Sequence, residues 1–241
     1  MKFTTRSFRT LPSTVSIILG VCLAACTTLP AQDVPEGFAP LFNGRDLTGW
    51  FGWGTSDPAK LKAMSPAELE AHHKSTLEDI NAHWSVVDGV LINDGEGLFL
   101  TTVKDYGDFE LHLEYKTVAK ADSGIYLRGV PQVQIWDYTD EKKFKLGADK
   151  GSGGLWNNKE MPGKDPLVLA DKPFGEWNAI RIIMVGESVT VYLNDKLVVD
   201  NAVMRNFFKP EEPIYKTGPI QLQTHGGEIS WRNIVIRELD E

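Results

Sequence analysis

The feature that most limits how this chain can fold is the stretch 107–116. Its apolar side chains stand at every second position, and two carboxylates, an imidazole and an ammonium group stand between them. A period of two is typical of a β-strand with one buried face and one polar face. We therefore predict a strand here whose odd-numbered residues enter a core.

Two later segments repeat this pattern. Strands are predicted at 123–128 and 132–137, and each carries polar or aromatic groups on one parity. If the three strands are neighbours in one sheet, their polar parities combine into a single surface rich in hydrogen-bonding and aromatic groups. We interpret that surface as the site of function.

The length of the chain and the placement of its glycines and prolines favour one all-β domain. The chain has 241 residues and 42% hydrophobic content, and β-sandwiches often reach this size as one domain. Most of the 22 Gly and 13 Pro fall between short alternating segments, and Asp88-Gly89 is typical of a type I′ hairpin turn.

One segment has a helical pattern. Ser65-Pro66-Ala67-Glu68 is a capping box with proline at the first helical position, so we predict a helical insertion over residues 57–81. We interpret His72, His73 and His83 as solvated or packed histidines rather than metal ligands, because adjacent histidines on a helix point in divergent directions.

The first 25 residues have the pattern of an export signal. Basic residues precede an apolar run too short to span a bilayer well, and Leu23-Ala24-Ala25-Cys26 ends it. This resembles the bacterial lipoprotein signal, which implies cleavage before Cys26 and acylation of its thiol. Ordinary cleavage near Ala25 and an uncleaved anchor remain alternatives.

Lipidation would fix the protein to the cell envelope. Several acyl chains on Cys26 suffice for stable membrane anchoring. Thr27 replaces the aspartate of inner-membrane retention signals, so the outer membrane facing the periplasm is expected where the cell has one. The proline-containing segment 26–40 reads as a lipidated tether, and 41–241 as the folded domain.

Cleavage also changes the charge and the thiol count. Without the three basic residues of the signal, 22 Lys and Arg stand against 33 Asp and Glu, so the net charge moves from −8 to near −11. This argues against a nucleic-acid partner. With Cys22 removed and Cys26 acylated, no thiol remains for a disulfide or a nucleophile.

Five segments together resemble a bacterial family of keto-sugar lyases, hydratases and 3-keto-disaccharide hydrolases. They occur in family order between about residue 37 and residue 239, at 41–50, 108–115, 123–129 with 133–135, 175–178 and 218–227. The resemblance implies a concanavalin A-like jelly-roll sandwich of two antiparallel sheets, with the ligand on the concave sheet. The chain departs from the family at Gln132, where glutamate is frequent, at Trp156, where tyrosine is usual, and in its longer helical insertion.

The resemblance also implies a reaction. A sugar already oxidised at C3 has an acidic proton at C2, and its removal lets the enolate expel the C1 substituent before water adds. This requires a base, an enolate stabiliser and an acid. We assign His225 as the first candidate base, Glu114 as base, acid or metal ligand, and Arg128 as the partner of the enolate.

The remaining candidates are binding residues. The side chains assigned to the sugar hydroxyls and ring are Glu110, Tyr126, Gln132, Gln134, Trp136, Asp137 and Trp156. A divalent metal cation held by oxygen and imidazole groups is a possible cofactor, but no ligand spacing identifies one.

An ordinary glycosidase is disfavoured. The Glu-x-Asp-x-x-Glu strand of classical glycosidases of this fold is absent, and Glu110 and Glu114 lie roughly 13 Å apart along a strand, too far for a carboxylate pair. Two alternatives to a carbohydrate-active lyase or hydrolase remain. One is a non-catalytic, lectin-like carbohydrate-binding protein, and the other is a surface interaction protein that uses the helical insertion.

The lipoprotein assignment predicts that a fatty-acid analogue labels the protein in a bacterial host and that Cys26→Ser abolishes the label. Recovery of a soluble mature protein with a free Cys26 thiol would contradict it.

Overall fold

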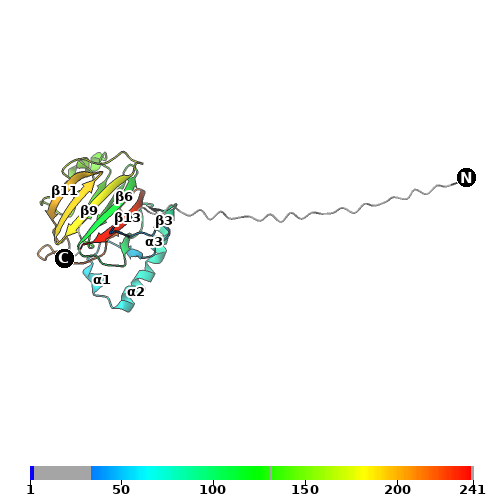
Figure 1. Cartoon of the computed structure of the whole chain (residues 1–241), viewed down its shortest axis with the longest axis horizontal. Helices are drawn as coiled ribbons and strands as arrows, with labels where there is room; N and C mark the ends of the chain where they lie inside the picture. Colours follow the sequence, from blue (N-terminus) through cyan, green and yellow to red (C-terminus); the bar gives the residue numbers. More distant parts are fainter. Residues whose placement is uncertain (3–33, 131, 240–241) are drawn as a thin grey trace. The chain divides into compact units, whose positions relative to one another are not determined.

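The computed structural model describes residues 1–2, 34–130 and 132–239. Two antiparallel sheets, one of eight strands and one of five, pack against each other (Figure 1). The predicted all-β, concanavalin A-like two-sheet sandwich is confirmed. The predicted signal, Cys26 and most of the tether lie outside the described residues.

The eight-stranded sheet, called the large sheet below, forms one layer. Its order is β11 (Lys196–Val203), β10 (Ser188–Leu193), β9 (Asn178–Val185), β6 (Phe109–Thr117), β13 (Ile229–Glu238), β4 (Val90–Asn93) and β3 (Trp84–Val87), with β1 (Ala39–Pro40) also paired to β13. Since β1 falls within the predicted tether, the sheet takes in residues before 41.

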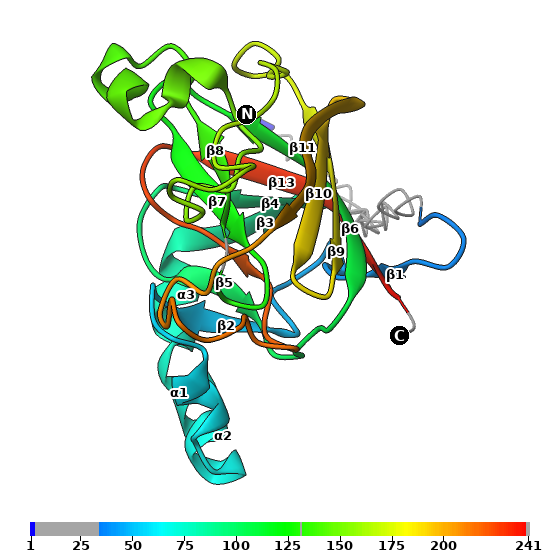
Figure 2. The same ribbon diagram turned by 90° about the vertical axis from the view of Figure 1, so that its left-hand side faces the viewer.

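The five-stranded sheet, called the small sheet, forms the second layer (Figure 2). Its order is β2 (Trp50–Trp53), β5 (Phe99–Thr102), β12 (Gln221–Leu222), β7 (Asp122–Tyr126) and β8 (Gln132–Trp136). The predicted strands at 123–128 and 132–137 are therefore real and adjacent, and they pair in antiparallel fashion.

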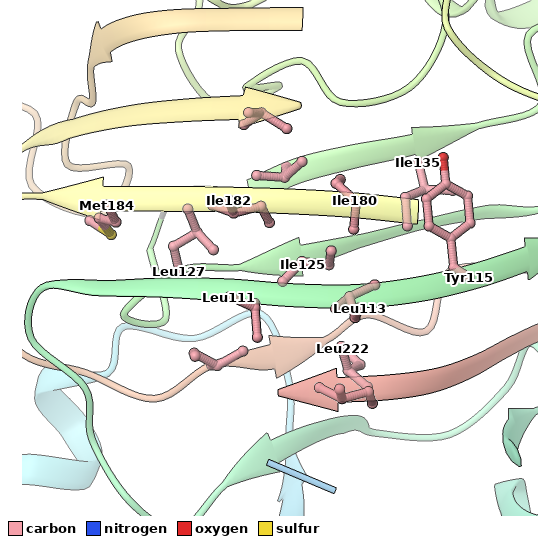
Figure 3. Packing of buried hydrophobic residues seen from close by; sticks show 14 of the residues in the cluster. Leu111, Leu113, Tyr115, Ile125, Leu127, Ile135, Ile180, Ile182, Met184 and Leu222 are labelled. Atoms are coloured by element: carbon pink, nitrogen blue, oxygen red, sulfur yellow. The ribbon is translucent and has the colours of Figure 1, made fainter. Parts of the chain in front are cut away.

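The alternating stretch forms β6 as predicted. Phe109, Leu111, Leu113 and Tyr115 are buried. They meet the inward side chains of the small sheet, among them Ile125, in one core (Figure 3). Each fully buried aliphatic side chain contributes about 1.5–3 kcal/mol of burial free energy, which holds the two layers together.

The condition for a single polar surface, that β6 neighbours β7 and β8 in one sheet, is not met. The two neighbours of β6 are β9 and β13, and the chain crosses to the other layer between Thr117 and Asp122. Both layers turn one parity toward the shared core and the other away from it, so periodicity alone cannot assign a strand to a layer. The polar parity of β6 consequently faces away from the small sheet.

Local turn and capping signals are confirmed. Asp88 and Gly89 both adopt positive φ, at 51° and 79°, and join β3 to β4. Ser65 and Glu68 form the reciprocal capping box at the start of α2 (Pro66–Ser75), which is flanked by α1 (Ala59–Lys62) and α3 (Leu77–His83).

The helical insertion packs through its histidines. The His73 ring lies 4.0 Å from that of Phe51, and the His72 ring lies 4.9 Å from that of Trp53. His83 contacts Asp94 at 3.0 Å. Figure 2 shows α1 and α2 beside β2, at one end of the small sheet. No helix among the described residues is long and apolar enough to cross a membrane.

Candidate active site

A cleft of about 290 Å³ opens on the face of the small sheet that is turned away from the core. We call it the cleft. Its lining residues come from β7, β8, the end of β12 and the loops around them: Thr55, Asp122, Tyr126, Gln132, Gln134, Trp136, Leu146, Trp156, Asn157, Lys159, Phe207, Gln223 and His225. They combine one carboxylate, two cations, amides and aromatic rings.

Asp122 is the centre of an ionic cluster at the cleft. One carboxylate oxygen, Oδ2, accepts from Lys143 Nζ at 2.6 Å and lies 3.0 Å from His225 Nδ1. Asp122 begins β7, His225 follows β12, and Lys143 belongs to the 3-10 helix η1 (Glu141–Leu146). The carboxylate is almost fully buried, whereas the His225 side chain is 61% exposed.

The cluster fixes the charge of each member. Hydrogen bonding to Asp122, aided by its charge, raises the pKa of His225 above its usual value against opposing effects of burial and of Lys143. Burial alone would raise the pKa of Asp122, but the hydrogen bonds and charges of His225 and Lys143 outweigh it and hold that pKa below its usual value. At neutral pH Asp122 is therefore an anion beside Lys143.

Three buried glutamines extend this cluster across the sheet. Gln134 Nε2 donates to Asp122 Oδ1 at 2.7 Å. Gln132 Nε2 donates to both Gln134 Oε1 and Gln223 Oε1, each at 2.6 Å. Gly124 makes room for them, because a Cβ there would lie 2.6 Å from Gln132 Nε2.

Aromatic rings also line the cleft. Trp136 and Trp156 meet edge to face, with centroids 5.4 Å apart and an interplanar angle of 87°. Trp156 is positioned by backbone pairing of the preceding residues with β8, through the Val133–Leu155 bridge. Burial raises the pKa of Tyr126 to about 12, so its phenol remains a neutral hydrogen-bonding group.

The cleft gathers six of the residues predicted from the sequence. These are Tyr126, Gln132, Gln134, Trp136, Trp156 and His225. Asp137 lies close by but has a different task, since its carboxylate accepts from the backbone N–H groups of Lys120 and Thr139 and from the Thr139 hydroxyl. It stabilises the turn after β8.

Glu110 and Glu114 lie on the outer face of the large sheet, on the far side of the core from the cleft. Glu110 is bonded to His112 and Arg237, and Glu114 to Arg232 and Asn233. The predicted cluster of His225, Glu114 and Arg128 therefore does not form.

Arg128 is also outside the cleft. Its side chain, 3% exposed, donates to the backbone oxygens of Gly107, Gly186 and Tyr215 and forms an ion pair with Asp108 at 2.6 Å. These contacts tie the start of β6 to the β9–β10 turn and to the loop before β12.

Three residues of the ionic and glutamine cluster escaped the sequence analysis. Asp122 begins β7 on the same parity as Tyr126, and Gln223 stands two residues before His225, so strand parity could have found both. Lys143 carries no such signal, because it reaches Asp122 from a separate 3-10 helix.

The described residues contain no group of three or more His, Cys, Asp or Glu side chains arranged to hold a metal ion. Larger hollows of about 460 and 510 Å³ occur elsewhere, but neither is lined by an interacting acid–base cluster with paired aromatic rings. Chemistry rather than volume therefore identifies the cleft as the candidate site.

A two-sheet sandwich with an aromatic and ionisable cleft on one face defines a lectin-like β-sandwich protein equipped with acid–base groups. More particularly, the chain belongs to the 3-keto-alpha-glucoside-1,2-lyase-like domain family, whose model matches residues 37–237. The family predicted from the sequence is thus confirmed.

Known relatives agree with this assignment. A 3-keto-disaccharide hydrolase from Bacteroides thetaiotaomicron is 24% identical over 250 residues, covering 85% of this chain and 79% of that protein. Two crystal structures of proteins from Parabacteroides distasonis, each described as a putative glycosyl hydrolase, share the fold. One has a TM-score of 0.58 and 24% identity over 85% of this chain and 95% of its own. The other has a TM-score of 0.52 and 28% identity, covering 66% and 91%.

The position of Arg128 generates a stability prediction. Arg128→Met leaves Asp108 and three backbone oxygens without their cation, and breaking a buried pair typically costs about 3–5 kcal/mol. We expect thermal unfolding to occur roughly 10 °C lower, while the protein that remains folded keeps its activity. Arg45→Met, at an exposed turn, is the control. A stable Arg128→Met protein without turnover would instead restore the catalytic assignment.

Proposed function

We propose that the protein is a carbohydrate-active enzyme that cleaves 3-keto-glycosides in the cleft by removing the C2 proton and eliminating the C1 substituent. The observation that carries the proposal is the contact of His225 with the buried carboxylate of Asp122 beside paired tryptophans. Family membership supports the same chemistry.

His225 serves as the base. Its Nδ1 faces the carboxylate of Asp122 at 3.0 Å, and that negative charge holds the ring proton on Nδ1, which leaves Nε2 as the nitrogen that accepts a proton. Asp122 is unsuited to that task because both of its oxygens are already engaged: Oδ1 accepts from Gln134, and Oδ2 accepts from Lys143 and contacts His225. It holds the histidine in one tautomer and orientation.

The reaction passes through an enolate. The lone pair of Nε2 takes the C2 proton, and the C–H electrons form a C2=C3 bond while the C3 carbonyl becomes an enolate. Re-formation of the carbonyl moves these electrons into a C1=C2 bond and expels the C1 substituent, which takes a proton from the imidazolium. Addition of water at C1 and C2 would make the overall reaction a hydrolysis.

The absence of a carboxylate pair favours an oxidised substrate. Among the described residues that line the cleft, Asp122 is the single acid. Classical glycosidases need two carboxyl groups across the scissile bond. A sugar activated by a C3 ketone needs only one base, which is what the cleft offers.

The rest of the cleft is suited to a sugar. Trp136 and Trp156 provide ring faces for stacking, and Tyr126 and the glutamines provide hydrogen bonds to hydroxyls. A non-catalytic lectin would use the same groups, but it would have no need of a buried carboxylate that orients an exposed imidazole.

Substrate selectivity is the first prediction of this proposal. The protein should release the C1 substituent from 3-keto-glycosides and leave the unoxidised parent glycosides intact, as followed by product release over time. Comparable cleavage of the unoxidised parents would point to a classical glycosidase, and binding without cleavage of either would favour the lectin.

The pH dependence is the second prediction. A base acts only after losing its proton, so kcat/KM should rise with pH through an apparent pKa above the usual value of about 6.5 for histidine. Asp122→Asn removes the group that raises this pKa, so the rising limb should move to lower pH. Lys143→Met removes a cation that lowers it, so the limb should move to higher pH. His225→Ala should lower turnover by about 10²–10⁴.

His225 would be excluded as the base if Asp122→Asn and Lys143→Met moved the rising limb of the pH profile in the same direction. An unchanged pH profile in His225→Ala would exclude it as well. Circular dichroism of each variant is the check on folding.

A further inference from the structure

In the proposed reaction a negative charge develops on the C3 oxygen of the sugar. The residue predicted to stabilise that charge is not in the cleft. Arg128 was assigned to the enolate from the sequence, but its guanidinium is buried elsewhere with four partners. A donor aimed into the cleft has to take its place, because unshared enolate charge in such a site would be costly.

The orientation of the glutamine chain points to one such donor. Asp122 is ionised and only accepts hydrogen bonds, so the side-chain atom of Gln134 facing it at 2.7 Å must be nitrogen. The other end of the Gln134 amide is then an acceptor, and the Gln132 atom that meets it at 2.6 Å must be nitrogen as well.

The same reasoning fixes the amide orientation of the third glutamine. Gln132 Nε2 has one hydrogen left, and it meets a side-chain atom of Gln223 at 2.6 Å. That atom must therefore be the acceptor Oε1. The orientation of all three amides therefore follows from the charge of Asp122.

One donor group remains at the end of the chain. Gln223 Nε2 has no hydrogen-bond partner among the described residues, although Gln223 is 5% exposed and lines the cleft. The same residue is fixed by its backbone, whose N–H bonds to Gly124 and whose carbonyl accepts from Ser123. It lies two residues from His225, which also lines the cleft.

We propose that Gln223 Nε2 donates to the C3 oxygen of the keto sugar and stabilises the enolate, and that Gln132 and Gln134 are positioning residues that orient its amide from Asp122. The inference rests on the proposed function. C2 and C3 are adjacent atoms, so base and enolate donor must act from the same part of the cleft, and His225 and Gln223 are two residues apart in the chain and both line it.

Gln223→Glu is the sharpest test. Glutamate keeps an acceptor oxygen for Gln132 but carries no N–H. The variant therefore loses the donor, keeps the bond to Gln132 and gains a negative charge. We expect kcat to fall by about 10²–10³, the usual loss for one oxyanion donor, with KM little changed because the contact strengthens as the enolate forms. Exchange of the C2 proton with solvent deuterium should slow by the same factor.

Gln223→Met is the second variant, since it removes the donor without adding a charge and should show the same fall in kcat. Gln221→Met is the control. It makes the same change two residues earlier, at a buried residue that bonds to Thr101 and does not line the cleft, so its kcat should match the wild type.

The positioning role has its own test. A carboxylate at position 132 accepts instead of donating, so in Gln132→Glu the Gln223 amide must reverse and present oxygen to the substrate. This variant should lose kcat although Gln223 is intact. Combining it with Gln223→Met should cost no more than the worse single change, because both act through one donor.

Three outcomes overturn the inference. They are wild-type kcat in both Gln223 variants, a rise in KM alone, and additive losses in the double variant. None of these is confused with failure of the proposed function, in which the wild-type protein itself would not cleave a 3-keto-glycoside.

Discussion

The burial of one face of each sheet against the other is the constraint on which the whole structure depends. Leu111 and Leu113 of β6 meet Ile125 and Ile135 of the small sheet in one core (Figure 3). Because successive side chains of a strand alternate in direction, this burial turns two polar faces outward in opposite directions. One face becomes a network of ion pairs on the large sheet, and the other carries the cleft.

Burial in the small sheet also requires that the polar groups of the cleft be hydrogen-bonded. Asp122, Gln132, Gln134 and Gln223 are all nearly inaccessible to solvent, so each lost hydrogen bond would carry a desolvation penalty of about 1–3 kcal/mol. They avoid this penalty by hydrogen-bonding to one another in a fixed direction. The same bonds preorganise the cleft, since amides oriented by a carboxylate need not rearrange when charge develops on a substrate.

Much of the fold followed from local pattern. The period of β6, the turn at Asp88-Gly89 and the capping box at Ser65 depend on residues close in sequence, and the structure has all three. The assignment of strands to layers did not follow, because both layers show the same period. Hence residues on β7, β8 and after β12 were grouped correctly, whereas Glu114 was placed with them although it lies in the other sheet. Lys143 could not be predicted from the sequence, because only tertiary packing brings η1 to Asp122.

The charge balance of the cluster is what joins the fold to the proposed chemistry. The chain has a net charge of −8, yet the cluster at the cleft becomes more positive as the reaction proceeds. While His225 is neutral, Lys143 balances the single buried carboxylate of Asp122, and transfer of the C2 proton turns His225 into a second cation. A neutral keto sugar gains little from these groups. An enolate gains much more, because the interaction grows only as the C2 proton leaves for His225. A cleft with this balance therefore favours the transition state over the bound substrate, which a site evolved only to bind sugar would have no reason to do.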